Sequence, residues 1–317
     1  MTLSNLSFVL ICGCLLMLRV DAWQPVNRRQ ALLGTSLAWP FTAAAADAPI
    51  AVLGASGRTG ALCVTTCLQQ GIPVRALTRT GVWPPSFIES AGNNNNNPLL
   101  TVGACNVQDP AAIAKGIQGC SAVIYAASAS AQGGNAKAID NVGVVSAAQA
   151  CWEARVSRYI VLSSTATTRP KSLGYIFTNL LVGGIMEEKR LGELAVAQLY
   201  DSRSRSSSGS YTIIRPGGLE EPKQNIVLGP SALEISQGDV LTGIVSRADL
   251  AALAVAVARS SRPNLRNTAL ELYYTDSVQP CETKFQKLVS NGQAPRLHGT
   301  TYEELLEDVQ PGIDYFA

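Results

Sequence analysis

Three glycines, Gly54, Gly57 and Gly60, separate a short apolar run from a stretch with helical spacing. The apolar run, residues 50–53, is typical of a buried parallel strand, and the helical stretch covers residues 61–70. A glycine-rich turn at this place leaves backbone N–H groups at the positive end of a helix, which suits a pyrophosphate. The glycines allow a tight turn, close approach of the phosphate and close packing of the helix on the strand. We therefore expect a dinucleotide site here; a plain strand-to-helix turn is the alternative.

The end of the second predicted strand, residues 73–78, indicates which dinucleotide binds. NAD-binding units place Asp or Glu about twenty residues past the glycines, against the ribose 2′-hydroxyl. Residues 75–80 contain no acidic side chain, whereas Arg79, together with Arg58, could bind a 2′-phosphate through charged hydrogen bonds. NADP(H) is therefore favoured over NAD(H). The alternative is that both arginines are solvated surface residues.

The rest of the chain alternates short apolar runs with helical stretches. This alternation predicts an α/β fold, a Rossmann-type doubly wound parallel sheet, with a small C-terminal subdomain on the substrate side. Residues 80–98 and 202–210 are polar and are expected to form loops, and Asp109 or Asn106 could cap the following helix. The strands are expected at 99–102, 122–126, 159–162, 211–215, 240–245 and 269–274, and the helices at 110–116, 140–154, 185–200, 247–258 and 302–309.

The 317-residue chain has 47% apolar and 15% charged residues, which is typical of a globular protein with an ample core. Its formal charge is +2, and basic and acidic residues balance once residues 1–46 are removed, so nucleic acid is not expected as a partner. Eight cysteines include no Cys-x-x-Cys pair, and His298 is the only histidine, so no metal site is predicted. Cys63 and Cys67 share one helix face and are expected to pack against the sheet.

Two targeting signals in series precede the predicted domain. Residues 6–18 form an apolar run with the length of a signal-peptide core, and small or β-branched residues follow at 20 and 22. Arg28 and Arg29 then open a twin-arginine segment that ends in alanines at 44–46. We expect a signal peptide over 1–22, a plastid transit or twin-arginine-like thylakoid segment over 23–46, and a single NAD(P)-binding domain over 47–317 with a C-terminal elaboration from about 217. The alternative is one signal peptide and a disordered spacer.

The paired signals resemble the bipartite presequence of algae whose plastid lies inside the endomembrane system, with Trp23 in the place of the aromatic residue that such presequences carry. The resemblance implies the plastid of an alga with a secondary plastid, with its thylakoid lumen as one location and the stroma as the alternative. No membrane span is expected in the mature chain.

The body of the chain, residues 49–276, resembles the atypical short-chain dehydrogenase/reductase superfamily, in its NAD(P)H-binding, NmrA-like and flavin/biliverdin-reductase-like branch. The motifs that carry the resemblance are Gly-Ala-Ser-Gly-Arg-Thr-Gly at 54–60, Asn-Val at 106–107, Tyr-Ile-Val-Leu-Ser-Ser at 159–164, Tyr-Thr-Ile-Ile-Arg-Pro-Gly-Gly at 211–218 and Ser-Arg-Ala-Asp-Leu at 246–250.

The resemblance implies a set of dinucleotide contacts. Ser163 would be the serine of the family's catalytic site, and Lys189 would hydrogen-bond the nicotinamide ribose. The other implied contacts are Gly54, Ser56, Gly57, Thr59 and Gly60 at the pyrophosphate, Arg58 and Arg79 at the adenosine phosphate, Asn106 and Val107 at adenine, Ala126, Ala127 and Ser128 on the ribose side, and Pro216 and Gly217 at the nicotinamide.

One position departs from the family's pattern. The family commonly places a tyrosine acid four residues before the lysine, where the ammonium lowers the pKa of the phenol. Ile185 occupies that position and cannot transfer a proton. Tyr175 is followed four residues later by Asn179, so it does not restore the pair. Lys189 therefore also suits a plain surface helix.

Hydride transfer to a delocalised ring does not strictly need the tyrosine, because the cofactor carries the chemistry and solvent can supply a proton. We expect an NADPH-dependent oxidoreductase acting on a flavin, quinone or tetrapyrrole-like acceptor. The alternative is a catalytically silent NADP(H)-binding redox sensor or photosystem-assembly factor with a plastid protein partner. An epimerase or dehydratase is disfavoured, because it too needs the tyrosine.

Overall fold

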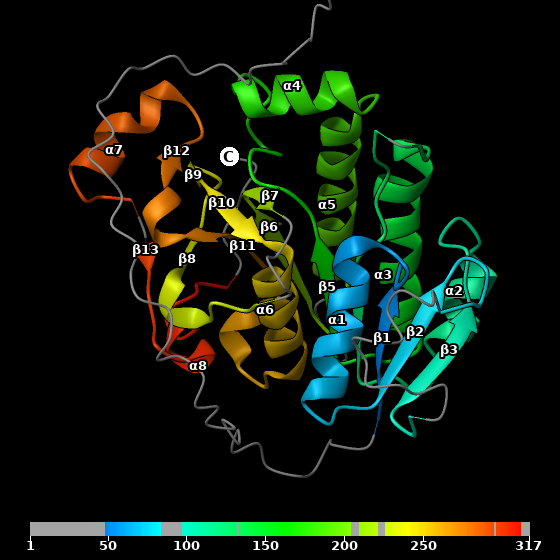
Figure 1. Cartoon of the computed structure of the whole chain (residues 1–317). Coiled ribbons are helices and arrows are strands. Elements are labelled where there is room, and N and C mark those ends of the chain that lie inside the picture. The colour runs from blue at the N-terminus through cyan, green and yellow to red at the C-terminus, as the bar shows by residue number, and fades with distance from the viewer. Residues whose placement is uncertain are drawn as a thin grey trace, which may run out of the picture. The chain divides into compact units, whose positions relative to one another are not determined.

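The computed structural model describes residues 48–83, 97–131, 133–203, 209–220, 226–294 and 296–311 (Figure 1). The two predicted targeting segments, 1–22 and 23–46, lie outside the described residues, and so do residues 84–96 of the predicted loop and 204–208 of the serine-rich loop.

A nine-stranded sheet forms the centre of the described part (Figure 1). Neighbouring strands from β3 to β11 are parallel. Beyond β11, strand β8 pairs antiparallel with β11, and the edge strand β13 pairs antiparallel with β8. The α/β prediction, a Rossmann-type sheet, is therefore confirmed. From edge to edge the order is β3 (Leu100–Ala104), β2 (Val74–Thr78), β1 (Ile50–Leu53), β4 (Ala122–Tyr125), β5 (Arg158–Leu162), β6 (Tyr211–Pro216), β11 (Thr268–Tyr274), β8 (Leu233–Ser236) and β13 (Arg296–Leu297).

The strand order reverses direction beside β1. From β1 the chain moves through β2 to β3 on one side, and then returns to β4 on the other side of β1. In open parallel sheets a ligand binds at such a switch point, outside the carboxyl ends of the strands. The ends of β1 and β4 therefore mark the expected position of the site.

Helices cover both faces of the sheet. Helix α1 (Arg58–Gln69) packs against α6 (Arg247–Arg259). The other helical layer consists of α2 (Pro110–Gly116), the π-helical turn η2 (Lys137–Gly143), α3 (Val144–Glu153) and α5 (Ile185–Asp201), and η2, α3 and α5 contact one another. Within the described ranges, no helix has the length and apolar content needed to cross a bilayer.

The strands that carry the switch point are buried along their whole length, because β1, β4, β5 and β6 have no exposed residue. The core between the sheet and α2, α3 and α5 includes the edge-to-face rings of Tyr125 and Tyr159. The hydroxyl of Tyr125 donates to the carbonyl of Ile139 at 2.6 Å, which ties η2 to the sheet.

Short elements follow β6. Strand β7 (Gly218–Glu220) pairs in parallel with β10 (Ile244–Ser246), and β9 (Leu241–Thr242) pairs with β12 (Gln279–Pro280). The remaining short elements are α7 (Gln286–Ser290), α8 (Tyr302–Leu305), and the 3₁₀ turns Pro230–Ala232, Pro263–Leu265, Thr275–Ser277 and Thr283–Phe285.

Most long elements lie where the sequence predicts them, and the helix at Pro110–Gly116 has the predicted bounds. The prediction was wrong for two helices in the C-terminal half of the chain. Helix α4 (Leu173–Leu181) stands in a segment for which no element was predicted, and α8 ends at Leu305 rather than at 309. The apolar residues of α4 do stand at helical spacing, but five of them are exposed, whereas such a stripe usually faces the core.

The packing of α1 on β1 depends on Gly60, and we predict that Gly60→Ala destabilises the protein by about 1–3 kcal/mol. A Cβ at this position would collide with the carbonyl oxygen of Gly54, which is backbone and cannot move away cheaply. The matched control is Gly174→Ala in α4, where a Cβ meets nothing within 4 Å. Urea unfolding should show a lower midpoint for Gly60→Ala only, and equal midpoints for both variants would contradict the prediction.

Candidate functional site

The glycine loop ends at an open helix N-terminus. Gly54 has φ +80°, and the amide of Gly57 donates to the Gly54 carbonyl at 2.9 Å. Gly57 is the N-cap of α1, its first turn contains no acidic residue, and no described side chain caps it. Ser56, Gly57 and Arg58 are exposed, whereas Gly60 is buried. The loop therefore presents the positive end of a helix to solvent.

A second backbone segment closes this loop from the side of β4. A Cβ on Gly54 would lie 2.7 Å from the backbone nitrogen of Ala127, so the two backbone segments touch with no side chain between them. Ala126 donates its amide to the carbonyl of Leu53 at 2.9 Å. The ends of β1 and β4 thus meet through bare backbone beside the open start of α1. In open α/β sheets the crevice outside such strand ends is where a dinucleotide would bind, and the residues present fit one.

The residues predicted to lie on the adenosine side stand after β2 and β3. Arg79 is exposed directly after β2, next to Thr78, whose buried hydroxyl has no hydrogen-bond partner among the described residues. Asn106 is exposed and Val107 is buried at 9% exposure. The helix cap is Asp109, which accepts from the Ala111 amide at 2.9 Å, rather than Asn106.

Lys189, which was predicted to contact the nicotinamide ribose, is held near the end of β4 by a buried carboxylate. Its Nζ lies 2.8 Å from Oδ1 of Asp140 on η2, and the Asp140 side chain is 1% exposed. The same carboxylate accepts from the Ser128 hydroxyl at 2.6 Å and from the Ala129 amide at 2.9 Å. Asp140 therefore joins α5 to the end of β4.

The sequence analysis did not identify Asp140 as part of the site. It falls at the start of the predicted helix 140–154, where an acidic residue is ordinary. Lys137, three residues earlier in the same helical segment, is the basic neighbour that the sequence offers, so nothing in the local pattern names Lys189 as the partner.

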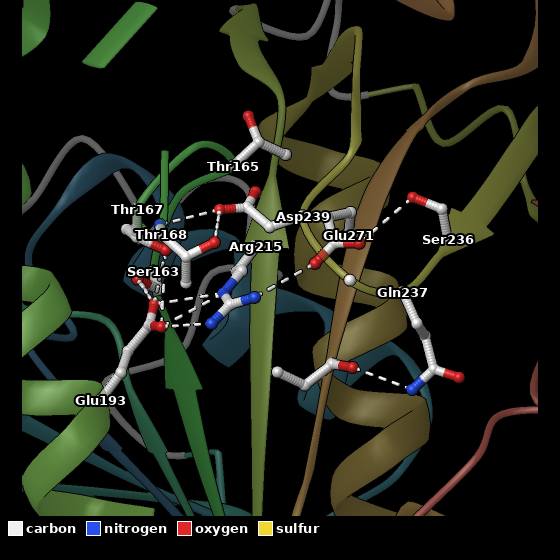
Figure 2. A network of polar contacts seen from close by, with 12 residues as sticks. Ser163, Thr165, Thr167, Thr168, Glu193, Arg215, Ser236, Gln237, Asp239 and Glu271 are labelled. Atoms are coloured by element: carbon white, nitrogen blue, oxygen red, sulfur yellow. Dashed lines mark hydrogen bonds and ion pairs between the residues drawn. The ribbon is translucent and has the colours of Figure 1, made fainter. Parts of the chain in front are cut away.

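Ser163 belongs to a buried polar network that crosses three strands (Figure 2). Its hydroxyl donates to Oε1 of Glu193 on α5, which lies one helical turn after Lys189. The other oxygen of Glu193 pairs with Nη2 of Arg215 at 2.6 Å, and Nη1 of Arg215 lies 3.3 Å from Glu271. Arg215 is completely buried. Ser163 therefore lies at the end of β5 with its hydroxyl already hydrogen-bonded to a buried carboxylate.

Asp239 anchors the chain that leaves β5. Its Oδ1 accepts from the Ala166 amide at 2.6 Å, and its Oδ2 accepts from the amide and hydroxyl of Thr168, each at 2.8 Å (Figure 2). Thr165 and Thr242 share a hydrogen bond of 2.8 Å between their hydroxyls. These contacts fix the segment after β5 against the short strands that follow β6.

Pro216 and Gly217, which were predicted to flank the nicotinamide, are both buried at the end of β6. The Gly217 amide donates to the Leu272 carbonyl at 2.9 Å, and a Cβ on Gly217 would collide with the carbonyl of Gly243. This corner therefore admits only glycine, and the backbone near it is rigidly placed.

No acid replaces the missing tyrosine in the described site. Ile185 is 4% exposed and packs in an apolar cluster with Ala129, Ala136 and Ala166. Tyr175 donates its hydroxyl to Glu187 at 2.7 Å. Burial, followed by the hydrogen bond to Glu187, raises the pKa of Tyr175 to about 12, so this phenol holds its proton near neutral pH.

Of the six cysteines that the structure describes, Cys281 packs against the apolar cluster around Ile185. Cys63 and Cys67 are buried in α1, and burial raises the pKa of the Cys67 thiol to about 12. In the part of the chain that the structure describes, no group of three or more His, Cys, Asp or Glu residues could hold a metal ion.

The predicted site residues thus fall into two groups. The glycine loop, Ala126–Ser128 and Lys189 converge on the crevice between β1 and β4, while Arg79, Asn106 and Val107 stand at the neighbouring strand ends. Ser163, Pro216 and Gly217 lie at the ends of β5 and β6, where the missed residues Glu193 and Arg215 hold the backbone in place.

The comparison with protein families gives one matching model, described as NAD(P)H-binding, over residues 54–261. The chloroplastic protein At2g34460 of Arabidopsis thaliana is 28% identical over 215 residues, which cover 64% of this chain and 70% of that protein. Protein TIC 62, chloroplastic, of Oryza sativa is 24% identical over 77% of this chain, and the match spans 50% of TIC 62.

Solved structures share the fold. The oxidoreductase ylbE of Lactococcus lactis has a TM-score of 0.56 at 19% identity, covering 82% of this chain and 96% of its own. A short-chain dehydrogenase/reductase of Veillonella parvula in complex with NADP has a TM-score of 0.52 at 16% identity, covering 73% and 96%. ChuY, an anaerobillin reductase of Escherichia coli O157:H7, has a TM-score of 0.52 at 20% identity, covering 72% and 98%. Together with the family match, these structures confirm the resemblance drawn from the sequence motifs.

The Lys189–Asp140 pair can be tested by a double-mutant cycle. Lys189→Met should destabilise the protein by about 3 kcal/mol, because it leaves a buried carboxylate without its counter-ion. Adding Asp140→Asn should restore most of that stability, since the amide needs no counter-ion. Thermal and urea unfolding of both single variants and the double variant measure the coupling, and strict additivity of the two changes would contradict the pair.

Glu271 should make stability depend on pH. Burial raises the pKa of this carboxyl to about 8, although the nearby Arg215 lowers it. The folded state therefore retains a proton that the unfolded state loses near its ordinary value of 4.5, and stability falls as the pH rises from about 5 to about 8.

Glu271→Gln should flatten this dependence, whose slope is at most about 1.4 kcal/mol per pH unit for one group. The control is Glu187→Gln, because a hydrogen bond from Arg190 lowers the pKa of Glu187 and moves its effect to acidic pH. Urea unfolding across this range measures the slopes, and an unchanged slope in Glu271→Gln would refute the assignment.

Proposed function

Because the chain belongs to the NAD(P)H-binding family, we propose that it is an NADPH-dependent oxidoreductase that reduces a flat, delocalised acceptor such as a flavin, a quinone or a tetrapyrrole. The observation that carries the proposal is the combination of Lys189, held at the ribose side by Asp140, with a buried Ile185 where the usual acid would stand. The site thus orients a dinucleotide and provides no phenol for proton transfer.

The cofactor would be held by the residues of the crevice. The amides at the start of α1 would face the pyrophosphate, and Lys189 would donate to the nicotinamide ribose. The bound dihydronicotinamide would supply a hydride. The chain's own part is to orient the ring against the rigid backbone near Gly217 and to exclude water from the apolar cluster around Ile185.

The acceptor class follows from what the site lacks. A carbonyl substrate that becomes an alkoxide needs a neighbouring acid, whereas a flavin or quinone spreads the incoming charge over its ring and takes its proton from solvent. The name of ChuY, an anaerobillin reductase with this fold, supports the inclusion of tetrapyrroles. An epimerase or dehydratase fits less well, because that chemistry requires the proton transfer that Ile185 cannot perform.

NADPH rather than NADH is proposed because Arg79 is exposed directly after β2 and no acid stands between Arg75 and Thr80. An exposed guanidinium at this strand end suits a 2′-phosphate, which a carboxylate would repel. Arg58, exposed at the first position of α1, would contribute from the other side of the adenosine.

A second function has one observation in its favour. The Ser163 hydroxyl is committed to Glu193, so both side chains of the usual Ser–Tyr pair are withdrawn from proton transfer. This arrangement suits a catalytically silent NADP(H)-binding redox sensor or photosystem-assembly factor. The similarity to TIC 62, a chloroplastic protein, agrees with a plastid role of either kind.

The proposed location is a plastid, since both curated relatives are chloroplastic. The two targeting signals in series further favour the secondary plastid of an alga and a final step into the thylakoid lumen. The stroma is the alternative location, because NADPH is supplied there. Twin-arginine export carries folded proteins, so a cofactor bound in the stroma would enter the lumen with the chain.

Turnover and cofactor preference can be measured in one experiment. The protein is mixed with NADPH or NADH and a flavin, a short-chain quinone or biliverdin, while the absorbance of the reduced nicotinamide is followed. We expect faster oxidation of NADPH. Arg79→Ala should lower the NADPH-to-NADH ratio of kcat/KM by roughly 10- to 100-fold, because a hydrogen bond to a charged group contributes about 1.5–3 kcal/mol.

The matched control is Lys115→Ala, which removes an exposed cation from the last turn of α2 and should leave the ratio unchanged. Tight binding of NADPH with no oxidation in any mixture would support the silent sensor instead. Failure to bind either dinucleotide would contradict both functions.

A further inference from the structure

Helix α4 exposes its most apolar face. Among the described residues thirteen large apolar side chains are exposed. Five of them belong to this nine-residue helix, so they form one dense patch rather than scattered exposed side chains. These five residues, the α4 face, are Leu173 (65% exposed), Ile176 (49%), Phe177 (58%), Leu180 (79%) and Leu181 (67%).

The spacing of the α4 face is that of a single helical stripe. Its residues stand at i, i+3, i+4, i+7 and i+8, which places them on one side of the helix. The opposite side carries Tyr175 and Val182, which pack into the apolar cluster around Ile185. An ordinary surface helix turns its apolar stripe to the core, so α4 is inverted.

Apart from Thr178 and Lys171, which are exposed, the polar side chains of this helix and its N-cap are already used inside the protein. Ser172 caps α4 by accepting from the Tyr175 amide, and the Tyr175 hydroxyl donates to Glu187. The side-chain oxygen of Asn179 accepts from the amides of Met186 and Glu187, at 3.0 and 3.3 Å. The α4 face itself therefore offers a partner hydrocarbon and no hydrogen-bonding side chain.

The charges at the two ends of α4 favour an anionic interface. Helix α4 contains no charged residue, and the exposed Lys171 stands just before its first turn. The next acids along the chain lie beyond the other end of α4, on α5, where Glu187 pairs with Arg190 at 2.8 Å and Glu188 accepts a hydrogen bond from the Asn141 side chain at 2.8 Å.

We propose that the α4 face docks on the surface of a lipid bilayer. A protein interface is on average only partly apolar and carries about one hydrogen bond per 100–200 Å², which the α4 face cannot provide. A bilayer needs only apolar side chains that enter the acyl boundary and a cation at the headgroups, as in interfacial helices. The inference does not depend on the proposed reaction.

Docking would turn the nicotinamide side of the crevice toward the membrane. Helix α4 lies across the end of α5 at which Ile185 begins (Figure 1), and one turn along α5 stands Lys189. Tyr175 and Asn179 fasten the two helices together, so a bilayer under α4 also fixes the orientation of α5.

The test uses the full chain and vesicles of phosphatidylcholine and phosphatidylglycerol with brominated acyl chains, which quench tryptophan at the acyl boundary. Phe177→Trp adds a reporter to the α4 face, and Val82→Trp adds one at a similarly exposed residue (62%) after β2. The signal of the four native tryptophans is subtracted with the wild-type chain. If the N-terminal apolar segment alone bound the vesicles, the tryptophans at 177 and 82 would be quenched equally.

We expect bromolipid to quench the tryptophan at 177 and to leave the one at 82 unchanged. In the Phe177→Trp background, Leu180→Ser and Leu181→Ser should each weaken vesicle binding by about tenfold, since each removes one apolar side chain from the acyl boundary.

Absence of quenching at 177, or equal quenching at both positions, would overturn the proposal. A dimer in light scattering that Leu180→Ser dissociates, without quenching at 177, would also overturn it, because a second copy of the chain would then cover the α4 face.

Discussion

The site depends on one close contact, the approach of three backbone segments at the bend after β1. Gly60 of α1 lies against the carbonyl of Gly54, and Gly54 lies against the backbone of Ala127 after β4. No Cβ fits in either contact, so the helix start, the end of β1 and the end of β4 occupy fixed places relative to one another. The amides at the helix start thereby face the crevice between β1 and β4. A looser packing would place the same residues nearby without forming a phosphate site.

Buried charges fix the other side of the crevice. Asp140 and Arg215 are almost completely removed from water, which is tolerable only because each has an opposite charge within hydrogen-bond reach. Asp140 connects η2 to Lys189, and Arg215 connects β6 to Glu193. Both partners stand on α5, one turn apart, so this helix is attached at two points to the ends of neighbouring strands. The position of α5 against the sheet follows from these two ion pairs.

The fold could be predicted from the sequence because its strong signals are local. The apolar run before Gly54, the glycine spacing and the helix at Pro110–Gly116 each depend on neighbouring residues, and the structure has them where they were predicted. The short strands β7, β8, β12 and β13 could not be predicted, since two to four residues carry no period and their pairing is decided by distant segments. Helix α4 was missed although its apolar residues stand at helical spacing, and nothing in that spacing tells that the stripe faces outward.

The candidate site residues could likewise be predicted only where a local motif marks them. The glycine loop and Lys189 follow from a motif, whereas Asp140 and Glu193 are ordinary acidic residues of helices, and only the fold brings them to Lys189 and Ser163. Ser163 shows why a motif position is not yet a role. The serine stands at the predicted strand end, but its hydroxyl donates to Glu193 and so its proton is directed away from the crevice.

Helix α5 is therefore the element through which the separate features act together. It begins at Ile185 in the apolar cluster, carries Lys189 to the ribose side, and one turn later pairs Glu193 with Arg215 in the sheet. Tyr175 and Asn179 attach α4 to its first turn. A displacement of α5 would move the lysine, release a buried carboxylate and shift α4 at once, and the cost of unpairing buried charges opposes it. The missing tyrosine does not loosen this arrangement, because Ile185 fills its place with a side chain that packs.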